Sequence, residues 1–414
     1  MKIVWICHFS DDKVQTRLRP WKKVSQFAPW ISKTVPTFEA RDDIELHIIA
    51  PHEYISGLKE YEQDGVHYHF FNPHMPILGR HWPAVFRWDI LTNFRHNKKV
   101  VGKLVDQISP DVIHLQGAEN PYYSATILPL IGKYPIVVNL QRINKKFLTN
   151  PDTANTQRAN IEKEIWDRAE NFTIRTKTMK FDFLSYKHTA NMFWVNYAMD
   201  GLEPIKSEKI YDIVYFARVS KEKGVEDLIQ ALGIVHSKFS KAKLCIIGGV
   251  SKRYKEHLLE MAKKLKVGNS VTWKGHLPTL ADVHKEASKA RISVLPTHND
   301  IISGTIIESM QLGLPVVSYK AGSIPELNEE RENVLLSDIG DIEGVADNIL
   351  RLLTDEELYK TMSQRGIECI RERYSNQNVL QQHLDCYREV IADFQNSKIK
   401  KQVTESSLRN GYTD

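Results

Sequence analysis

The chain has 414 residues, of which 42% are hydrophobic and 26% are charged. One hydrophobic core stops growing well below this length, so we expect two domains. The 56 Lys and Arg residues exceed the 51 Asp and Glu residues by five, an excess that suits phosphorylated ligands and is too small to indicate a nucleic-acid partner.

Cysteine usage and hydropathy indicate the cellular setting. The four cysteines have no metal-ligand or redox spacing, so we expect reduced thiols in the core. The apolar run at residues 3–7 is too short for a secretory leader, and no apolar stretch reaches the roughly 20 residues of a membrane span. We therefore expect a cytoplasmic protein, at most peripheral to the inner face of a membrane.

Short apolar runs with the composition of buried strands alternate with amphipathic helical stretches along the whole chain. The strands expected in the first half are residues 2–9, 44–50, 66–71, 111–116 and 135–140. Those expected in the second half are residues 211–217, 243–249, 270–275, 291–296, 314–318 and 333–336. This alternation predicts an α/β protein with two doubly wound, Rossmann-like domains that face each other across a cleft.

The polar stretch 196–209, with Gly201 and Pro204, precedes a strand that restarts the strand–helix alternation, and we place the domain boundary there. The expected segments are a first domain at 1–200, a second domain at 205–375, a helix at 376–395 that crosses back to the first domain, and a frayed polar tail at 396–414.

The segment 299–318, "NDIISGTIIESMQLGLPVVS", combines two carboxylates with a helix start. Ser303 is a candidate N-cap, and Gly304 permits a ligand to approach the backbone. The first N–H groups of such a helix form an anion site. Asp300 would repel a bare phosphate and fits sugar hydroxyls better, while Glu308 fits vicinal hydroxyls such as those of ribose. The alternative is an ordinary helix with a solvated Glu and a turn Asp.

Two cations, Arg218 and Lys223, follow the expected strand 211–217 and precede a helix. Cations at the carboxyl end of a strand can neutralise a diphosphate leaving group without a metal. The alternative is a solvated basic loop.

These motifs, "FARVSKEKGVEDLIQAL", "LCIIGG", "VTWKGHLP" and "VLPTHNDIISGTIIESMQLGLPVVSYKAGSIPEL", occur in an order and at a spacing that resemble the retaining, nucleotide-sugar glycosyltransferases of family four, which have the GT-B fold. The resemblance covers most of the chain and is strongest over residues 211–327. It implies a first domain that binds the acceptor and a second that binds the donor.

The resemblance also assigns residues. Those implied to bind the donor are Arg218, Lys223, Ser303, Gly304, Thr305, Glu308, Lys274, Gly275 and His276. Those implied to be catalytic are Asp300, Arg218, Lys223 and His114. It implies no metal and no cofactor, a UDP-sugar in preference to a GDP-sugar as donor, transfer with retention to a carbohydrate or lipid-linked glycan, and a place in surface polysaccharide or glycoconjugate biosynthesis.

The chain departs from the family in several places. Asp300 stands where the family commonly has Glu, and "FSDDKVQTRLRPW" replaces the usual Gly-rich loop, so that Arg17 is an alternative cation there. Gln116 and Gln141 stand where histidines are frequent, and His114 remains from a histidine pair. Gln116, Gln141 and Arg17 are therefore weak acceptor-side candidates, and the core is the alternative place for His114.

The stretch 79–103 mixes aromatic and basic residues in a way that would suit an anionic membrane surface holding a lipid-linked acceptor. The alternative is a helix pair with its aromatic side in the core. Two other functions stay open, a catalytically weak sugar-nucleotide-binding protein and a nucleotide-sugar epimerase. A nicotinamide dehydrogenase is disfavoured, because "GGVSKR" at 248–253 is not the G-x-G-x-x-G motif.

Overall fold

The structure is a computed structural model that describes residues 1–9, 12–18, 29–39, 41–73, 88–141, 153–199 and 202–410. The chain forms two compact units. Unit 1 contains residues 1–175, 179–198 and 376–414, and unit 2 contains residues 176–178 and 199–375. Unit 1 is therefore built from segments that lie on both sides of unit 2 in the sequence.

Unit 1 has a twisted sheet with the strand order β3-β4-β2-β1-β5-β6-β7-β8, in which β3 runs antiparallel to β4 and the other neighbouring pairs are parallel. Its strands are β1 (Lys2–Ile6), β2 (Glu45–Pro51), β3 (Leu58–Gln63), β4 (Val66–Phe71), β5 (Val112–Leu115), β6 (Ile136–Asn139), β7 (Asn171–Ile174) and β8 (Asn191–Trp194). Its helices are α1 (Asp12–Leu18), α2 (Pro29–Thr34), η1 (Val35–Thr37), α3 (Trp88–Leu91), α4 (Arg95–Ile108), α5 (Pro121–Ser124), η3 (Ala125–Ile127), α6 (Thr153–Arg168), α7 (Lys177–Tyr186) and α14 (Asn376–Asn410).

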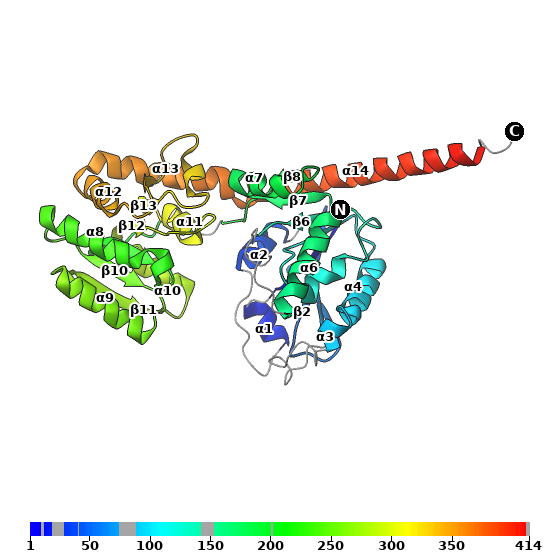
Figure 1. Cartoon of the computed structure of the whole chain (residues 1–414), viewed down its shortest axis with the longest axis horizontal. Helices are drawn as coiled ribbons and strands as arrows, with labels where there is room; N and C mark the ends of the chain where they lie inside the picture. Colours follow the sequence, from blue (N-terminus) through cyan, green and yellow to red (C-terminus); the bar gives the residue numbers. More distant parts are fainter. Residues whose placement is uncertain are drawn as a thin grey trace. The chain divides into compact units, whose positions relative to one another are not determined.

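Helix α14 completes the core of unit 1. Tyr387 of α14 is fully buried, and its hydroxyl accepts a hydrogen bond from the Trp5 indole nitrogen of β1 at 2.9 Å. Leu384 and Val390 of the same helix belong to the apolar cluster that also holds Ile3. The helix, drawn in orange to red in Figure 1, continues to Asn410, well past the end expected near residue 395. The stretch lacks glycine and proline up to that point, so nothing in it forces the helix to stop.

Unit 2 has a parallel sheet with the order β11-β10-β9-β12-β13-β14. Its strands are β9 (Tyr211–Phe216), β10 (Leu244–Ile247), β11 (Val271–Gly275), β12 (Ala290–Leu295), β13 (Val316–Tyr319) and β14 (Leu335–Ser337). Its helices are η5 (Lys221–Lys223), α8 (Val225–Lys238), α9 (Lys252–Lys264), η6 (Gly268–Ser270), α10 (Leu280–Ala287), α11 (Gly304–Gln311), η7 (Ile324–Asn328), α12 (Ile342–Thr354) and α13 (Glu356–Tyr374).

The central strands of unit 2 are apolar on both faces because helices cover both sides of the sheet. On β10, Leu244 and Ile246 join the cluster that contains α8, α9 and α12, whereas Cys245 and Ile247 join the cluster beneath α10. This burial explains the nearly unbroken apolar runs of the sequence. The burial of these strands also holds the sheet in place. Because β9 and β12 are parallel neighbours, the polar loops that follow them lie at the same edge of the sheet.

The four cysteines are all free and buried. None of the helices in the described part of the chain combines the length and the apolarity that a bilayer crossing requires.

Candidate functional site

Lys223 and Asp300, from two different loops of unit 2, form an ion pair. Lys223 ends η5, which follows β9, and Asp300 lies in the loop after β12. The Lys223 ammonium group donates a hydrogen bond to Oδ2 of Asp300, and the two side chains are 20% and 19% exposed. The sequence predicts both residues at the ligand but not their contact. The pair leaves two further N–H groups of the ammonium for a ligand.

Two glycines let these loops come close to their neighbours. Gly224, directly after Lys223, has φ +73°, and a Cβ added to it would lie 1.8 Å from the carbonyl oxygen of Pro296. Gly322 has φ +52°, and its Cβ would lie 1.6 Å from the carbonyl oxygen of Asp300. Because any side chain would force these backbones apart, both positions require glycine. Gly322 thus supports the loop that carries Asp300, a role that the sequence alone does not indicate.

A second set of contacts braces the same two loops. The backbone N–H of His298 donates to the carbonyl oxygen of Glu222 at 2.9 Å. The Nε2 atom of His298 lies 2.8 Å from Oδ2 of Asp227. The same Asp227 oxygen accepts a hydrogen bond from the Tyr319 hydroxyl at 2.9 Å. Burial, reinforced by the Asp227 carboxylate, raises the pKa of Tyr319, so this hydroxyl keeps its proton. The loops after β9 and β12 are therefore held as one rigid support.

Helix α11 begins beside this support. Ser303 occupies the N-cap position with extended backbone angles, although its side chain makes no capping hydrogen bond. The Thr305 hydroxyl donates to the carbonyl oxygen of Phe216 at 2.9 Å, so it fixes the helix start to the end of β9. A Cβ on Gly304 would meet nothing within 4 Å, so the space around this residue is open. The first backbone N–H groups of the helix have no acceptor within the helix and suit an anion.

Glu308, one turn into α11, lies against His284 of α10. The His284 Nε2 is 3.3 Å from Oε2 of Glu308, and both side chains are largely buried. At this geometry His284 Nε2 has no hydrogen-bond partner among the described residues. A buried ring nitrogen without a partner is costly, so His284 is a further candidate to contact a ligand held by Glu308. The sequence alone does not indicate His284, because it lies 24 positions before Glu308 and only the fold brings the two side chains together.

Arg218 is more accessible than Lys223. Its side chain is 72% exposed, and its guanidinium group lies 3.8 Å from the Glu222 carboxylate. It borders a hollow of about 420 Å³ at the ends of β9 and β10, whose other lining residues are Val219, Ser220, Lys221, Gly249, Val250, Ser251 and Tyr254. A long cationic side chain with this freedom can reach a phosphate in the hollow.

The expected base-contacting loop lies at the end of β11. Lys274 is the last residue but one of the strand, and its ammonium group lies 3.0 Å from Oε1 of Glu286. The hydrogen bond to Glu286 raises the pKa of Lys274. Gly275 has φ +70°, and the next residue, His276, is exposed. Lys274 is thus already paired, and contacts of these three residues with a nucleotide base stay a prediction.

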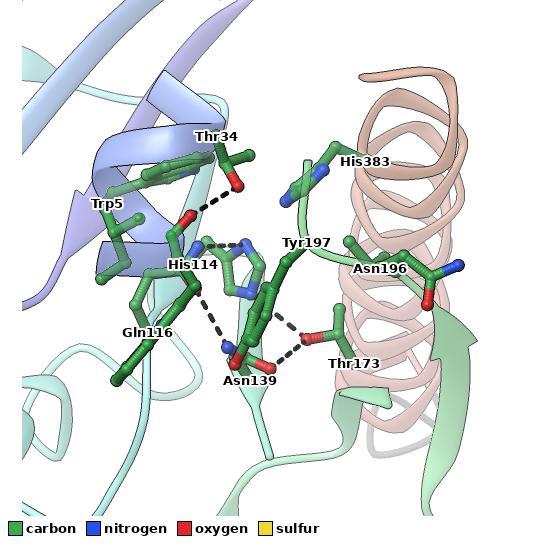
Figure 2. A pocket seen from close by; sticks show the side chains of 12 residues that line it. Trp5, Thr34, His114, Gln116, Asn139, Thr173, Asn196, Tyr197 and His383 are labelled. Carbon is green, nitrogen blue, oxygen red and sulfur yellow. Dashed lines mark hydrogen bonds between the residues drawn. The ribbon is translucent and has the colours of Figure 1, made fainter. Parts of the chain in front are cut away.

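In unit 1, His114 lies in the core. Its Nδ1 is 2.8 Å from the Tyr387 hydroxyl and 3.2 Å from Nε2 of Gln116, and its Nε2 is 3.4 Å from the Thr173 hydroxyl. His114, Gln116 and Thr173 are among the residues that line a cavity of about 10 Å³. Figure 2 shows these three side chains, with the Asn139 amide beside Gln116. Burial lowers the pKa of His114 well below its usual range. This is the environment of a hydrogen-bonded core histidine, and a catalytic role for His114 stays a prediction.

The other acceptor-side candidates also have local partners. The Gln141 amide donates to the carbonyl oxygen of Gln116 at 2.8 Å, which ties the end of β6 to the end of β5. Arg17 of α1 is exposed, with its guanidinium carbon 5.5 Å from the centre of the Tyr61 ring. These contacts account for both residues without a ligand, so their roles toward an acceptor stay predictions.

Part of the aromatic and basic stretch 79–103 lies outside the described residues, namely residues 79–87. In the described part, Phe94 is buried and its ring packs edge-on against Tyr122, as the core alternative requires. Trp88 is 75% exposed, and Leu91 of the same helix is exposed as well. A contact of this stretch with a membrane surface stays a prediction.

Comparisons with known proteins bear on both units. Residues 203–368 match the family model described as Glycosyl transferases group 1. N-acetyl-alpha-D-glucosaminyl L-malate synthase of Bacillus anthracis is 27% identical over 194 residues, 47% of this chain and 49% of that protein. The capsular polysaccharide biosynthesis glycosyltransferase CapM of Staphylococcus aureus is 24% identical over 184 residues, 44% of this chain and 47% of that protein. The chain thus matches about half the length of these curated relatives.

Solved structures resemble the chain over nearly its full length. Sucrose-phosphate synthase from Thermosynechococcus elongatus has a TM-score of 0.68 at 15% identity, with 95% of this chain and 100% of that chain covered. HepE from Anabaena, solved in complex with UDP, has a TM-score of 0.66 at 17% identity, with 94% of this chain and 100% of that chain covered. At these identities the likeness establishes the fold, which is the GT-B fold predicted from the sequence.

Proposed function

We propose that this chain transfers a sugar from a nucleotide diphosphate-sugar to an acceptor, because residues 203–368 match the family model of the group 1 glycosyltransferases and the chain has the GT-B fold. The proposed donor is a UDP-sugar. HepE, a protein of the same fold, was solved with UDP and with UDP-glucose, which supports this choice.

One arrangement in unit 2 carries the proposal. The Lys223–Asp300 pair, the exposed Arg218 and the start of α11 all belong to loops that the Thr305–Phe216 hydrogen bond and the His298–Glu222 hydrogen bond hold together. Two cations and a set of free backbone N–H groups form a site for a pyrophosphate.

Charge development explains what this site does chemically. When the bond between the sugar and the diphosphate breaks, negative charge builds up on the departing phosphate. Lys223 and Arg218 stabilise that charge, and the pair with Asp300 holds the Lys223 ammonium in place beforehand, so little reorganisation is needed during the reaction. Asp300 exchanges part of its contact with Lys223 for hydroxyls of the donor sugar. Glu308 binds the ribose hydroxyls, with His284 as its neighbour.

The finer features follow the resemblance of the sequence and are part of the proposal. They are retention of the anomeric configuration, a donor site that works without a metal, and a carbohydrate or lipid-linked glycan as acceptor. The capsular polysaccharide enzyme among the relatives supports a role in surface polysaccharide biosynthesis. The cytoplasm, at or near the inner face of a membrane, is the place where such donors are used.

The test is a panel of UDP- and GDP-sugars in a thermal-shift screen, because a ligand that binds the folded state raises its melting temperature. Hydrolysis of the stabilising donor is then followed by release of the nucleoside diphosphate. We expect stabilisation by UDP-sugars and slow hydrolysis without an acceptor. Binding without any hydrolysis or transfer would favour the catalytically weak binding protein, and release of a changed sugar nucleotide would favour the epimerase.

A further inference from the structure

A cluster of histidines and glutamates lies on one face of the sheet of unit 1, at the strands β2, β3 and β4. Glu45 and His47 alternate along β2, and His67 and His69 alternate along β4. His47 is the register partner of His67. Because register partners and every second residue share a face, these four side chains lie together. The opposite face carries the apolar cluster with Leu46 and Ile48.

Three of these residues have the geometry of metal ligands. One ligand atom each from Glu45, His47 and His67 lies within 4.8 Å of the other two. Among the described residues, no other three His, Cys, Asp or Glu side chains come together in this way. Ligand atoms around a tetrahedral zinc ion, at about 2.0–2.1 Å from it, are about 3.4 Å apart. The His47 Nε2 and Glu45 Oε1 atoms are 2.9 Å apart already, and the rings of His47 and His67 stack with centres 4.6 Å apart. Small rotations of the partly exposed Glu45 and His67 side chains toward the buried His47 would complete the site.

Hydrogen counting gives an independent reason for a cation. His47 and His69 take part in three close contacts in a row: His47 Nε2 with Glu45 at 2.9 Å, His47 Nδ1 with His69 Nε2 at 3.0 Å, and His69 Nδ1 with Glu60 at 2.6 Å. Three contacts require three hydrogens, but two neutral imidazoles carry only two. One contact therefore sets a lone pair against a lone pair unless a further positive species occupies it.

A metal ion at the Glu45 end satisfies the whole row. His69 then donates its Nδ1 hydrogen to Glu60, and His47 donates its Nδ1 hydrogen to His69, which leaves His47 Nε2 free to bind the metal. This is the common second-layer arrangement of metal-binding histidines, in which the ring nitrogen away from the metal donates to a fixed acceptor.

We propose that Glu45, His47 and His67 bind one divalent transition-metal ion, with Zn²⁺ as the best match and water in the remaining position. Imidazole and carboxylate ligands together suit Zn²⁺, whereas Mg²⁺ and Ca²⁺ prefer oxygen alone. The Lys2 ammonium, 3.5 Å from Glu45, is a competing cation that moves aside into solvent when the metal binds. The ion would tie β2 to β4 and is separate from the donor site, which lies in unit 2.

The test uses the full chain, freed of metal with a chelator and titrated with ZnCl₂ by calorimetry and by competition with a chromophoric chelator. We expect one tightly bound Zn²⁺ per chain, a higher melting temperature with Zn²⁺, and no heat with MgCl₂. Glu45→Gln and His67→Gln change partly exposed residues and should weaken binding more than about 100-fold. His69→Gln, which removes the supporting ring, should weaken it about 10- to 100-fold and keep the stoichiometry.

The matched control is His188→Gln, because His188 is an exposed histidine of the same unit outside this cluster. It should bind Zn²⁺ as the unaltered chain does. Circular dichroism of each variant checks that the fold is intact. If the chain does not bind Zn²⁺ at micromolar concentration, the proposal is wrong. A third hydrogen, on a protonated histidine, then completes the three contacts between Glu45, His47, His69 and Glu60. Equal affinity in Glu45→Gln, His67→Gln and the control would also overturn it.

Discussion

Replacing Lys223 with Met tests the proposed role of the ion pair in leaving-group stabilisation. Met keeps the length and apolar stem of the side chain but removes its charge, so the change is mainly electrostatic. Lys223 is only 20% exposed and lies beside Asp300, which the substitution leaves without its partner. Loss of one preorganised donor to a developing anion costs about 2–4 kcal/mol of transition-state stabilisation. That range corresponds to about a 30- to 1000-fold fall in kcat/KM.

The assay is release of UDP from the donor sugar nucleotide, with nucleotide affinity measured separately by calorimetry. The double variant Lys223→Met with Asp300→Asn shows how much of the loss comes from leaving Asp300 unpaired, since both charges are then absent. Lys320→Met is the control, because Lys320 also pairs with an aspartate of unit 2, Asp338, but on the exposed surface. If Lys223→Met turned over as fast as Lys320→Met, the assignment of Lys223 to the diphosphate would be refuted.

Four further results are expected. Arg218→Ala should lower kcat/KM by a similar 2–4 kcal/mol, about 30- to 1000-fold, and normal kinetics would remove Arg218 from the phosphate site. Glu308→Ala should weaken nucleotide binding more than it slows turnover; calorimetry that shows undiminished affinity would contradict the ribose contact. Small-angle scattering should change when donor binds, as closure of two domains on a substrate requires, and identical curves would count against closure. Burial lowers the pKa of His383 from 6.5 to about 4, so the unfolded chain binds more protons between these values and stability falls as the pH is lowered through them. This group alone contributes about 3 kcal/mol to that loss, and denaturant unfolding of His383→Gln should show a flatter acid limb; an unchanged slope would contradict this.

The sequence predicts most of the sheets, and what it misses has a physical cause. Each of the apolar runs expected to be a strand overlaps one, with ends that agree to within about three residues. The three missed strands are β3, β7 and β8. In β3, "LKEYEQ", most side chains are exposed at the edge of the sheet, so no apolar run marks it. In β7, "NFTI", Asn171 and Thr173 interrupt the apolar run, and β8, "NMFW", lies at the other edge of the sheet, where its side chains are exposed or only partly buried.

The candidate site shows a different limit. Helix-start and cation motifs are local, so the sequence indicates Lys223, Asp300 and Glu308 individually. The contact between Lys223 and Asp300 joins residues 77 positions apart, and only the order of β9 and β12 in the sheet brings them together. For the same reason, His284 and Gly322 carry no signal of their own in the sequence.

The return of α14 to unit 1 has a consequence for how the chain matures on the ribosome. Synthesis of unit 2 ends at residue 375, when Tyr387 and the rest of α14 have not yet been made. Tyr387, the hydrogen-bond partner of both Trp5 and His114, is therefore synthesised only after unit 2. Although domains usually fold from the N-terminus onward during translation, here the second unit can mature first, while the opening half of the polypeptide waits for its final helix.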